Sequence, residues 1–103
     1  MLIVLTTVGS AGEGESLARS IVEAKLAACV QILPQMTSVY FWKGKIQSEP
    51  EHLLLIKTLE EKFDELSAFI RKNHSYNVPE IVAIEADNVS KTYLGWLQQS
   101  LSD

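Results

Sequence analysis

The chain has 103 residues, of which 47% are apolar and 21% are charged, and its formal net charge is −4. This length suits one compact domain, and the composition excludes disordered, collagen-like and repeat proteins. The acidic balance gives no concentrated basic face, so nucleic acid is not an expected partner. The apolar content is high for so small a core, which predicts assembly into an oligomer.

The compartment is indicated by the single cysteine, Cys29, which has no partner for an internal disulfide and therefore fits a reducing environment. The apolar residues 1–5 have no basic segment before them, and the run is too short for a signal peptide or a membrane span. We therefore expect a cytoplasmic protein with no membrane partner.

Two elements are expected in the first third of the chain. Residues 2–7 form a continuous apolar and β-branched run, which predicts a central strand buried on both faces. Residues 15–28 place Leu17, Ile21 and Ala24 on one helical stripe, which predicts an amphipathic helix.

The glycine-rich segment 9–14 joins this strand to this helix, where a phosphate-binding loop would lie. It has neither the G-x-G-x-x-G spacing nor a terminal Gly-Lys-Ser/Thr, and Glu13 would repel a phosphate. We therefore expect a plain flexible connection here.

A long β-hairpin is expected from residue 29 to residue 58, turning at Gly44 between two apolar and aromatic runs. Pro34 interrupts its first arm and Pro50 its second. Because proline cannot donate to a β-ladder, we expect each arm to bend there and the tip to project beyond the main sheet.

The last third predicts two helices separated by a strand. Thr58 and Glu61 have the spacing of a capping box, which would start a helix at this point. Residues 81–84 read as a strand, and Ser90 can cap a final helix. The order is β-α-β-β-α-β with an extra helix, which predicts an α+β, ferredoxin-like split βαβ fold with an antiparallel sheet, in one domain over residues 1–103.

Metal ligands are few. Cys29, His52 and His74 cannot fill a Cys₄ or Cys₂His₂ site within one chain. A weaker site for Cu²⁺ or another divalent cation could use His74 and Cys29, since imidazole and thiolate suit such ions. The alternative is that Cys29 is a buried small apolar residue and that His74 caps the end of a helix.

Aromatic residues are numerous in the hairpin and the turns, and they favour a packing surface between subunits over a ligand pocket, although the two are compatible. They are Tyr40, Phe41, Trp42, Tyr76, Tyr93 and Trp96.

Five blocks of the chain carry a family resemblance. They are Leu26-Ala27-Ala28-Cys29-Val30, Ser38-x-Tyr40-x-Trp42-x-Gly44-x-Ile46, Glu51 followed by Leu55-x-Lys57-Thr58, His74-x-Tyr76-x-Val78-Pro79-Glu80-Ile81, and Tyr93-Leu94-x-Trp96. In this order and spacing they resemble the CutA family over nearly the whole chain. The resemblance implies a homotrimer with an architecture similar to that of PII signalling proteins, with hairpins packed across subunit boundaries. It also implies a role in tolerance to divalent cations, copper in particular, with no established enzymatic reaction.

Copper ligands in this family are associated with three positions, which here correspond to Thr6, Asn73 and His74. Only the last is a ligand of the family type, and Ser75 replaces the proline usual after the histidine. These departures weigh against tight copper binding, so we expect a weakly bound ion.

A ligand-binding cleft between subunits is the second expectation, because several polar residues of the matched blocks have no place in the apolar stripes. We expect the cleft to be lined by Lys57, Tyr76, Glu80, Trp96 and Tyr93. The main alternative to a copper-tolerance protein is therefore a PII-like sensor that binds a small metabolite there. An enzyme is a third and weaker alternative.

Overall fold

A computed structural model describes residues 1–102 and shows a mixed α+β fold with an antiparallel sheet, as predicted. Strand β2 lies beside β4, β4 beside β1 and β1 beside β5, while β3 pairs with the far part of β4. In chain order the elements are β1 (Leu2–Val8), α1 (Ala11–Glu23), β2 (Cys29–Ile32), β3 (Met36–Trp42), β4 (Lys45–Thr58), the 3-10 turn η1 (Glu60–Lys62), α2 (Phe63–Asn73), β5 (Val82–Glu85) and α3 (Lys91–Leu101).

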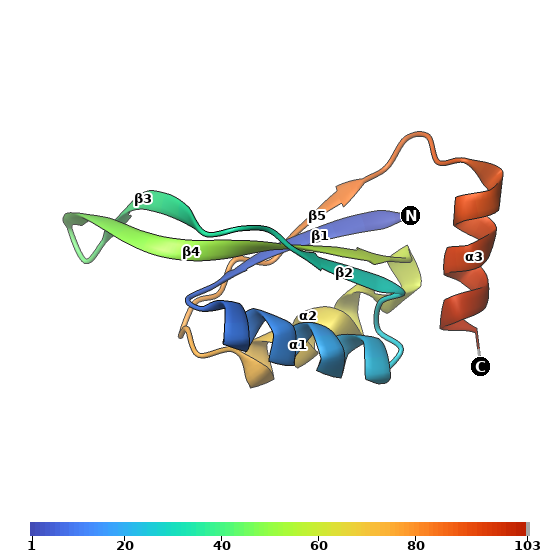
Figure 1. Cartoon of the computed structure of the whole chain (residues 1–103), viewed down its shortest axis with the longest axis horizontal. Coiled ribbons are helices and arrows are strands. Elements are labelled where there is room, and N and C mark those ends of the chain that lie inside the picture. The colour runs from blue at the N-terminus through green and yellow to red at the C-terminus, as the bar shows by residue number, and fades with distance from the viewer. Residues whose placement is uncertain (103) are drawn as a thin grey trace.

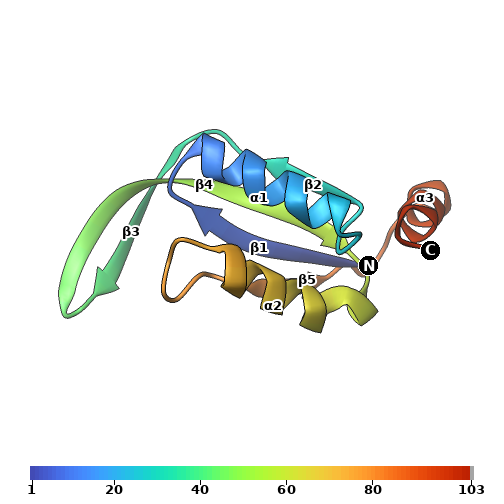
Figure 2. The ribbon, with the colours of Figure 1, turned by 90° about the horizontal axis from the view of Figure 1, so that it is seen from below.

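The core lies between the sheet and one layer of helices. Helices α1 and α2 run side by side under the same face of the sheet (Figures 1 and 2). Alternate residues of the two central strands, such as Val4 and Ile56, point into this layer and are fully buried. They pack with Leu17 and Ile21 of α1 and with Leu66 and Ile70 of α2.

The opposite face of the sheet is apolar as well. The other alternate residues form cross-strand pairs there, including Leu5 with Leu55 and Ile3 with Ile84. None of the helices within residues 1–102 covers this face (Figure 1). Val82 and Ile84 of the edge strand β5 are 48% and 50% exposed. We call this surface the open face.

The hairpin projects beyond the sheet, as expected, and gives the molecule its elongated shape of 45 × 26 × 23 Å (Figure 1). Its two-residue turn has positive φ at both Lys43 (51°) and Gly44 (77°), the geometry that matches the twist of paired strands. Pro34 separates β2 from β3, as predicted. The predicted interruption at Pro50 is wrong, because β4 is continuous. At that position β4 pairs only with β3, so the proline lies where the strand has a free edge.

Helix α1 differs from its predicted range at both ends. The Ser10 hydroxyl accepts the backbone N–H of Glu13 at 3.1 Å and caps a helix that begins at Ala11, not at residue 15. The expected flexible connection over residues 9–14 is therefore wrong, because most of it is the first helical turns. The helix ends at Glu23 rather than at residue 28, before Lys25 with φ of 56°.

The capping box at Thr58 is also wrong. Thr58 is the last residue of β4 and is fully buried, and its hydroxyl donates to the Leu26 carbonyl at 2.7 Å. The chain passes through η1 before α2 begins at Phe63. By contrast, the predicted cap of the last helix is confirmed, because the Ser90 hydroxyl accepts the Tyr93 N–H at 3.3 Å.

Candidate functional site

A groove with a volume of about 790 Å³ lies between the hairpin and the segment that follows α2. Strand β3 contributes the side chains of Ser38, Tyr40 and Trp42 to its wall, and Val39 borders it as well. Strand β4 contributes Glu49 and Glu51, and the segment after α2 contributes residues 76–78 and Glu80. We call it the hairpin groove. Alternation along β3 places these three side chains on one face of the hairpin, opposite the face that carries Val39 and Phe41.

A partly buried hydrogen bond connects two sides of the hairpin groove. The Tyr76 hydroxyl donates to Glu51 Oε2 at 2.8 Å, and Glu51 is only 8% exposed. Burial raises the pKa of the Tyr76 phenol, and the hydrogen bond and negative charge of Glu51 raise it further. Tyr76 therefore stays protonated at neutral pH and acts as a hydrogen-bond donor.

His74 positions the backbone on which Tyr76 sits. Its side chain is fully buried, and its Nε2 lies 2.7 Å from the carbonyl oxygen of Thr7. Its Nδ1 accepts the backbone N–H of Tyr76 at 3.0 Å. Because a carbonyl only accepts and a backbone N–H only donates, the ring is the neutral tautomer protonated at Nε2. His74 follows the last residue of α2, but its ring bonds strand β1 rather than the end of the helix.

The first turn of α1 holds the same segment from the other side. Glu13 Oε2 accepts the Ser75 hydroxyl at 2.8 Å and the Ser75 N–H at 3.3 Å. In the sequence, Glu13 stands out only as a residue that would repel phosphate, and Ser75 only as a departure from a family pattern. The contact joins residues 62 positions apart, and no local pattern indicates it.

The predicted cleft residues form two groups within one chain. Tyr76 and Glu80 line the hairpin groove. The Lys57 ammonium lies 5.4 Å from the centre of the Tyr93 ring, and the rings of Tyr93 and Trp96 are 5.5 Å apart. This second group is beside α3, at the end of the molecule opposite the hairpin (Figure 1).

The predicted metal ligands are also apart. Cys29 of β2 lies opposite Lys57 of β4, and Lys57 lies opposite Ile3 of β1. The His74 ring instead bonds Thr7, at the other end of β1. Four strand positions separate Ile3 from Thr7, a distance of about 13 Å. Within residues 1–102 no group of three or more His, Cys, Asp or Glu side chains could hold a metal ion.

The three positions that the sequence resemblance associates with copper have other partners or none. His74 bonds Thr7, and the Asn73 side-chain amide donates to the Phe69 carbonyl at 2.9 Å. Thr6 is fully buried, and among the described residues its hydroxyl has no hydrogen-bond partner.

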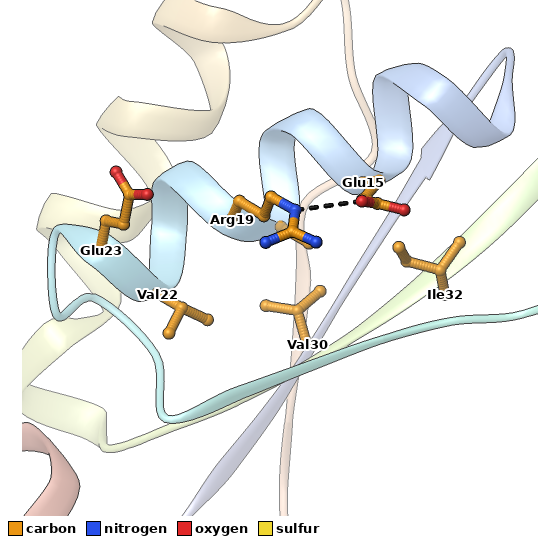
Figure 3. Close-up of a pocket in the computed structure, with 7 residues that line it drawn as sticks. Glu15, Arg19, Val22, Glu23, Val30 and Ile32 are labelled. Carbon is orange, nitrogen blue, oxygen red and sulfur yellow. Dashed lines mark hydrogen bonds and ion pairs between the residues drawn. The ribbon is translucent and has the colours of Figure 1, made fainter.

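A second hollow, of about 360 Å³, lies between α1 and the edge strand β2 (Figure 3). Its floor is formed by Val22, Val30 and Ile32, and at its rim Arg19 Nε pairs with Glu15 at 3.0 Å. This ion pair is well exposed, so the hollow offers less chemistry than the hairpin groove.

The fold and the site define a class of small α+β, ferredoxin-like proteins with a projecting hairpin and a groove beside it. Residues 2–100 match the model of the family described as CutA1 divalent ion tolerance protein. The chain belongs to this family, as the sequence resemblance indicated.

Relatives agree in sequence and structure. The chain is 41% identical over 98 residues to the divalent-cation tolerance protein CutA of Thermus thermophilus, covering 95% of each. It is 44% identical over 99 residues to a rice protein named Protein CutA 1, chloroplastic, covering 96% of this chain and 56% of the rice protein. The chain thus spans about half the length of this plant relative. The crystal structure of a point variant of CutA1 from Pyrococcus horikoshii superposes with a TM-score of 0.96 at 32% identity, over 100% of both chains. No helix within residues 1–102 is long and apolar enough to cross a membrane.

Proposed function

We propose that this chain acts as a homotrimeric, non-catalytic binding protein in divalent-cation tolerance and that it holds a small molecule in the hairpin groove at a subunit boundary. The observation that carries the proposal is the hairpin groove itself, with the partly buried Glu51–Tyr76 hydrogen bond in its lining. Its volume is within the ~300–1,000 Å³ range of ligand pockets.

Assembly is supported by the outer face of the hairpin. Val39, Phe41 and Ile46 are 68%, 74% and 70% exposed, and Phe41 pairs directly with Ile46. The open face of the sheet, on the other side of β4, is a second exposed apolar surface, and such surfaces are typical of sites where proteins associate. A hairpin packed on a neighbouring subunit would cover these residues, and the neighbour would border the hairpin groove.

A small molecule is a better occupant of the site than copper. Both ring nitrogens of His74 already have backbone partners, so a copper ion would have to displace one of them. The copper site proposed from sequence, His74 with Cys29, therefore remains the weaker part of this proposal. It would use ligands from different subunits, because one chain holds the two residues apart.

Three further points complete the proposal. A cytoplasmic location is supported by the lone thiol of Cys29, which fits a reducing compartment. The protein's partners are copies of itself, with neither nucleic acid nor membrane, and residues 1–103 form one domain.

The test is equilibrium binding to the purified full chain. Cu²⁺, Zn²⁺ and a panel of cationic, neutral and anionic metabolites are titrated against wild type and Ser38→Phe, which fills the hairpin groove. Ser16→Phe, on the exposed surface of α1, is the matched control. We expect a metabolite to bind wild type and Ser16→Phe, and to bind Ser38→Phe at least tenfold more weakly. Copper binding in the micromolar range or tighter with no metabolite binding would contradict the proposal.

A further inference from the structure

We propose that the ligand of the hairpin groove is a small organic cation, an ammonium or guanidinium compound held between aromatic rings and carboxylates. This inference rests on the proposed function and specifies the class of ligand.

The charge of the lining is the first argument. Three carboxylates, Glu49, Glu51 and Glu80, contribute to the wall, and the lining side chains that the structure describes include no lysine or arginine. Lys45, the basic residue closest in register, pairs with Trp42 at the hairpin tip and lies outside the lining. A concave surface with carboxylates of one sign concentrates cations and repels anions.

The state of Glu51 is the second argument. Only 8% of the Glu51 surface is exposed, and Tyr76 donates a hydrogen bond to its Oε2 only. Within residues 1–102 Oε1 has no hydrogen-bond donor, and it is not among the fully buried atoms that lack a partner, so it remains accessible. A carboxylate largely withdrawn from water is stabilised by a donor or a positive charge. An ammonium or guanidinium group in the groove would supply both.

The aromatic side chains are the third argument. Tyr40 and Trp42 are 42% and 45% exposed on the groove wall, although water is an unfavourable neighbour for such large rings. Tyr76 adds a third ring. The face of an aromatic ring attracts a cation, tryptophan most strongly, and rings around carboxylates are typical of sites for alkylammonium groups.

A metal ion is a poor fit to the same residues. Divalent ions need several oxygen, nitrogen or sulfur ligands converging on one point. The described residues contain no such cluster, so the carboxylates are dispersed around the groove. Dispersed negative charge with apolar rings between suits an organic cation, whose charge is spread over a larger volume.

The experiment measures binding of choline, agmatine and spermidine to the purified full chain by calorimetry. The neutral isostere of choline, 3,3-dimethylbutan-1-ol, and the dianion glutarate are the ligand controls. We expect one of the cations to bind at least tenfold more tightly than either control. We expect Glu80→Gln, Glu51→Gln and Trp42→Leu each to weaken it at least fivefold. Glu80 is exposed, so its variant tests the inference even if Glu51→Gln does not fold. Glu23→Gln, on the exposed part of α1, is the matched control and should bind as wild type does.

The outcomes separate this inference from the proposed function. If glutarate or the neutral isostere binds as tightly as the cations, and Ser38→Phe blocks that binding, the cation inference is wrong and the proposed function survives. Cation binding that is unchanged in Glu80→Gln and Glu51→Gln would also overturn the inference. If no probe or metabolite binds, both fail. A loss of oligomer in Glu80→Gln without any cation binding would mean that a second copy of the chain fills the groove, which also overturns the inference.

Discussion

Tyr76 donates its hydroxyl to Glu51 across 2.8 Å and so joins the segment after α2 to strand β4, 25 positions earlier in the chain. Both residues line the hairpin groove. The bond shapes the candidate site and also stabilises the fold, because it satisfies an oxygen of a buried carboxylate.

Replacing Tyr76 by Phe should therefore lower the free energy of unfolding by about 1–3 kcal/mol, the cost of leaving a buried acceptor without its donor. Chemical denaturation at pH 7 and one fixed protein concentration measures this difference. Tyr40→Phe is the control, since Tyr40 is half exposed and its hydroxyl has no hydrogen bond within residues 1–102. Equal losses in the two variants would contradict the role given to the Glu51 bond.

The same hydrogen bond predicts a dependence of stability on alkaline pH. The pKa of Tyr76 is raised in the folded protein, mainly by burial and then by Glu51. The unfolded chain therefore loses this proton first, at about pH 10, and the folded state becomes less stable as pH rises above that value. Tyr76→Phe should lose less stability between pH 9 and 11 than wild type does. A parallel decline of both proteins in that range would rule out this contribution.

Thr6 and Thr58 should respond in opposite ways to the same substitution. Both are fully buried, but Thr58 donates to the Leu26 carbonyl and the Thr6 hydroxyl has no partner in the described part of the chain. Thr6→Val removes an unpaired polar atom and should stabilise the protein by about 1 kcal/mol. Thr58→Val removes a hydrogen bond and should destabilise it by about 1–2 kcal/mol. Denaturation midpoints measured side by side decide this, and destabilisation by Thr6→Val would show that its hydroxyl has a partner.

Copper binding should be weak and should depend on His74. His74→Ala should reduce the affinity for Cu²⁺ more than Cys29→Ser does, because imidazole is the stronger candidate ligand and Cys29 is half-buried beside β4. Binding should weaken as the pH is lowered, since protons compete for the imidazole nitrogen. Calorimetry with His52→Ala as the control tests this, and an affinity unchanged in His74→Ala would exclude His74 as the ligand.

The sequence predicted the elements better than their ends. The apolar stripes that define α1 and α2 and the alternation of the central strands depend on which face is buried, and this pattern is local. Gly12 and Gly14 suggest a loop, so the sequence does not indicate where α1 begins. The Ser10 cap and the tight packing of Gly14 against Val8 and Ile32 make this segment helical. The capping box predicted at Thr58 is wrong because the Thr58 hydroxyl bonds a distant carbonyl, that of Leu26, rather than the start of the following helix.

The site was only partly predictable for the same reason. Glu80 has no place in an apolar stripe, so the sequence predicts that it shares a cleft with Tyr76, and both residues line the hairpin groove. The roles of Glu51, Glu13 and Ser75 depend on contacts between segments far apart in the chain, which spacing cannot reveal. Lys57, Tyr93 and Trp96 do not line this groove within one chain. They could border it only on a neighbouring subunit, so their place in the cleft stays a prediction.

Assembly into a trimer determines what covers the outer face of the hairpin and what borders the groove. Sedimentation equilibrium of the full chain at micromolar concentration measures it directly. We expect a mass three times the 11.5 kDa of one chain. Phe41→Asp, which places a charge on the 74%-exposed apolar residue of the hairpin, should lower this mass, whereas Lys43→Asp at the turn should leave it unchanged. A wild-type protein that sediments as a stable monomer would contradict trimeric assembly and, with it, the proposed function.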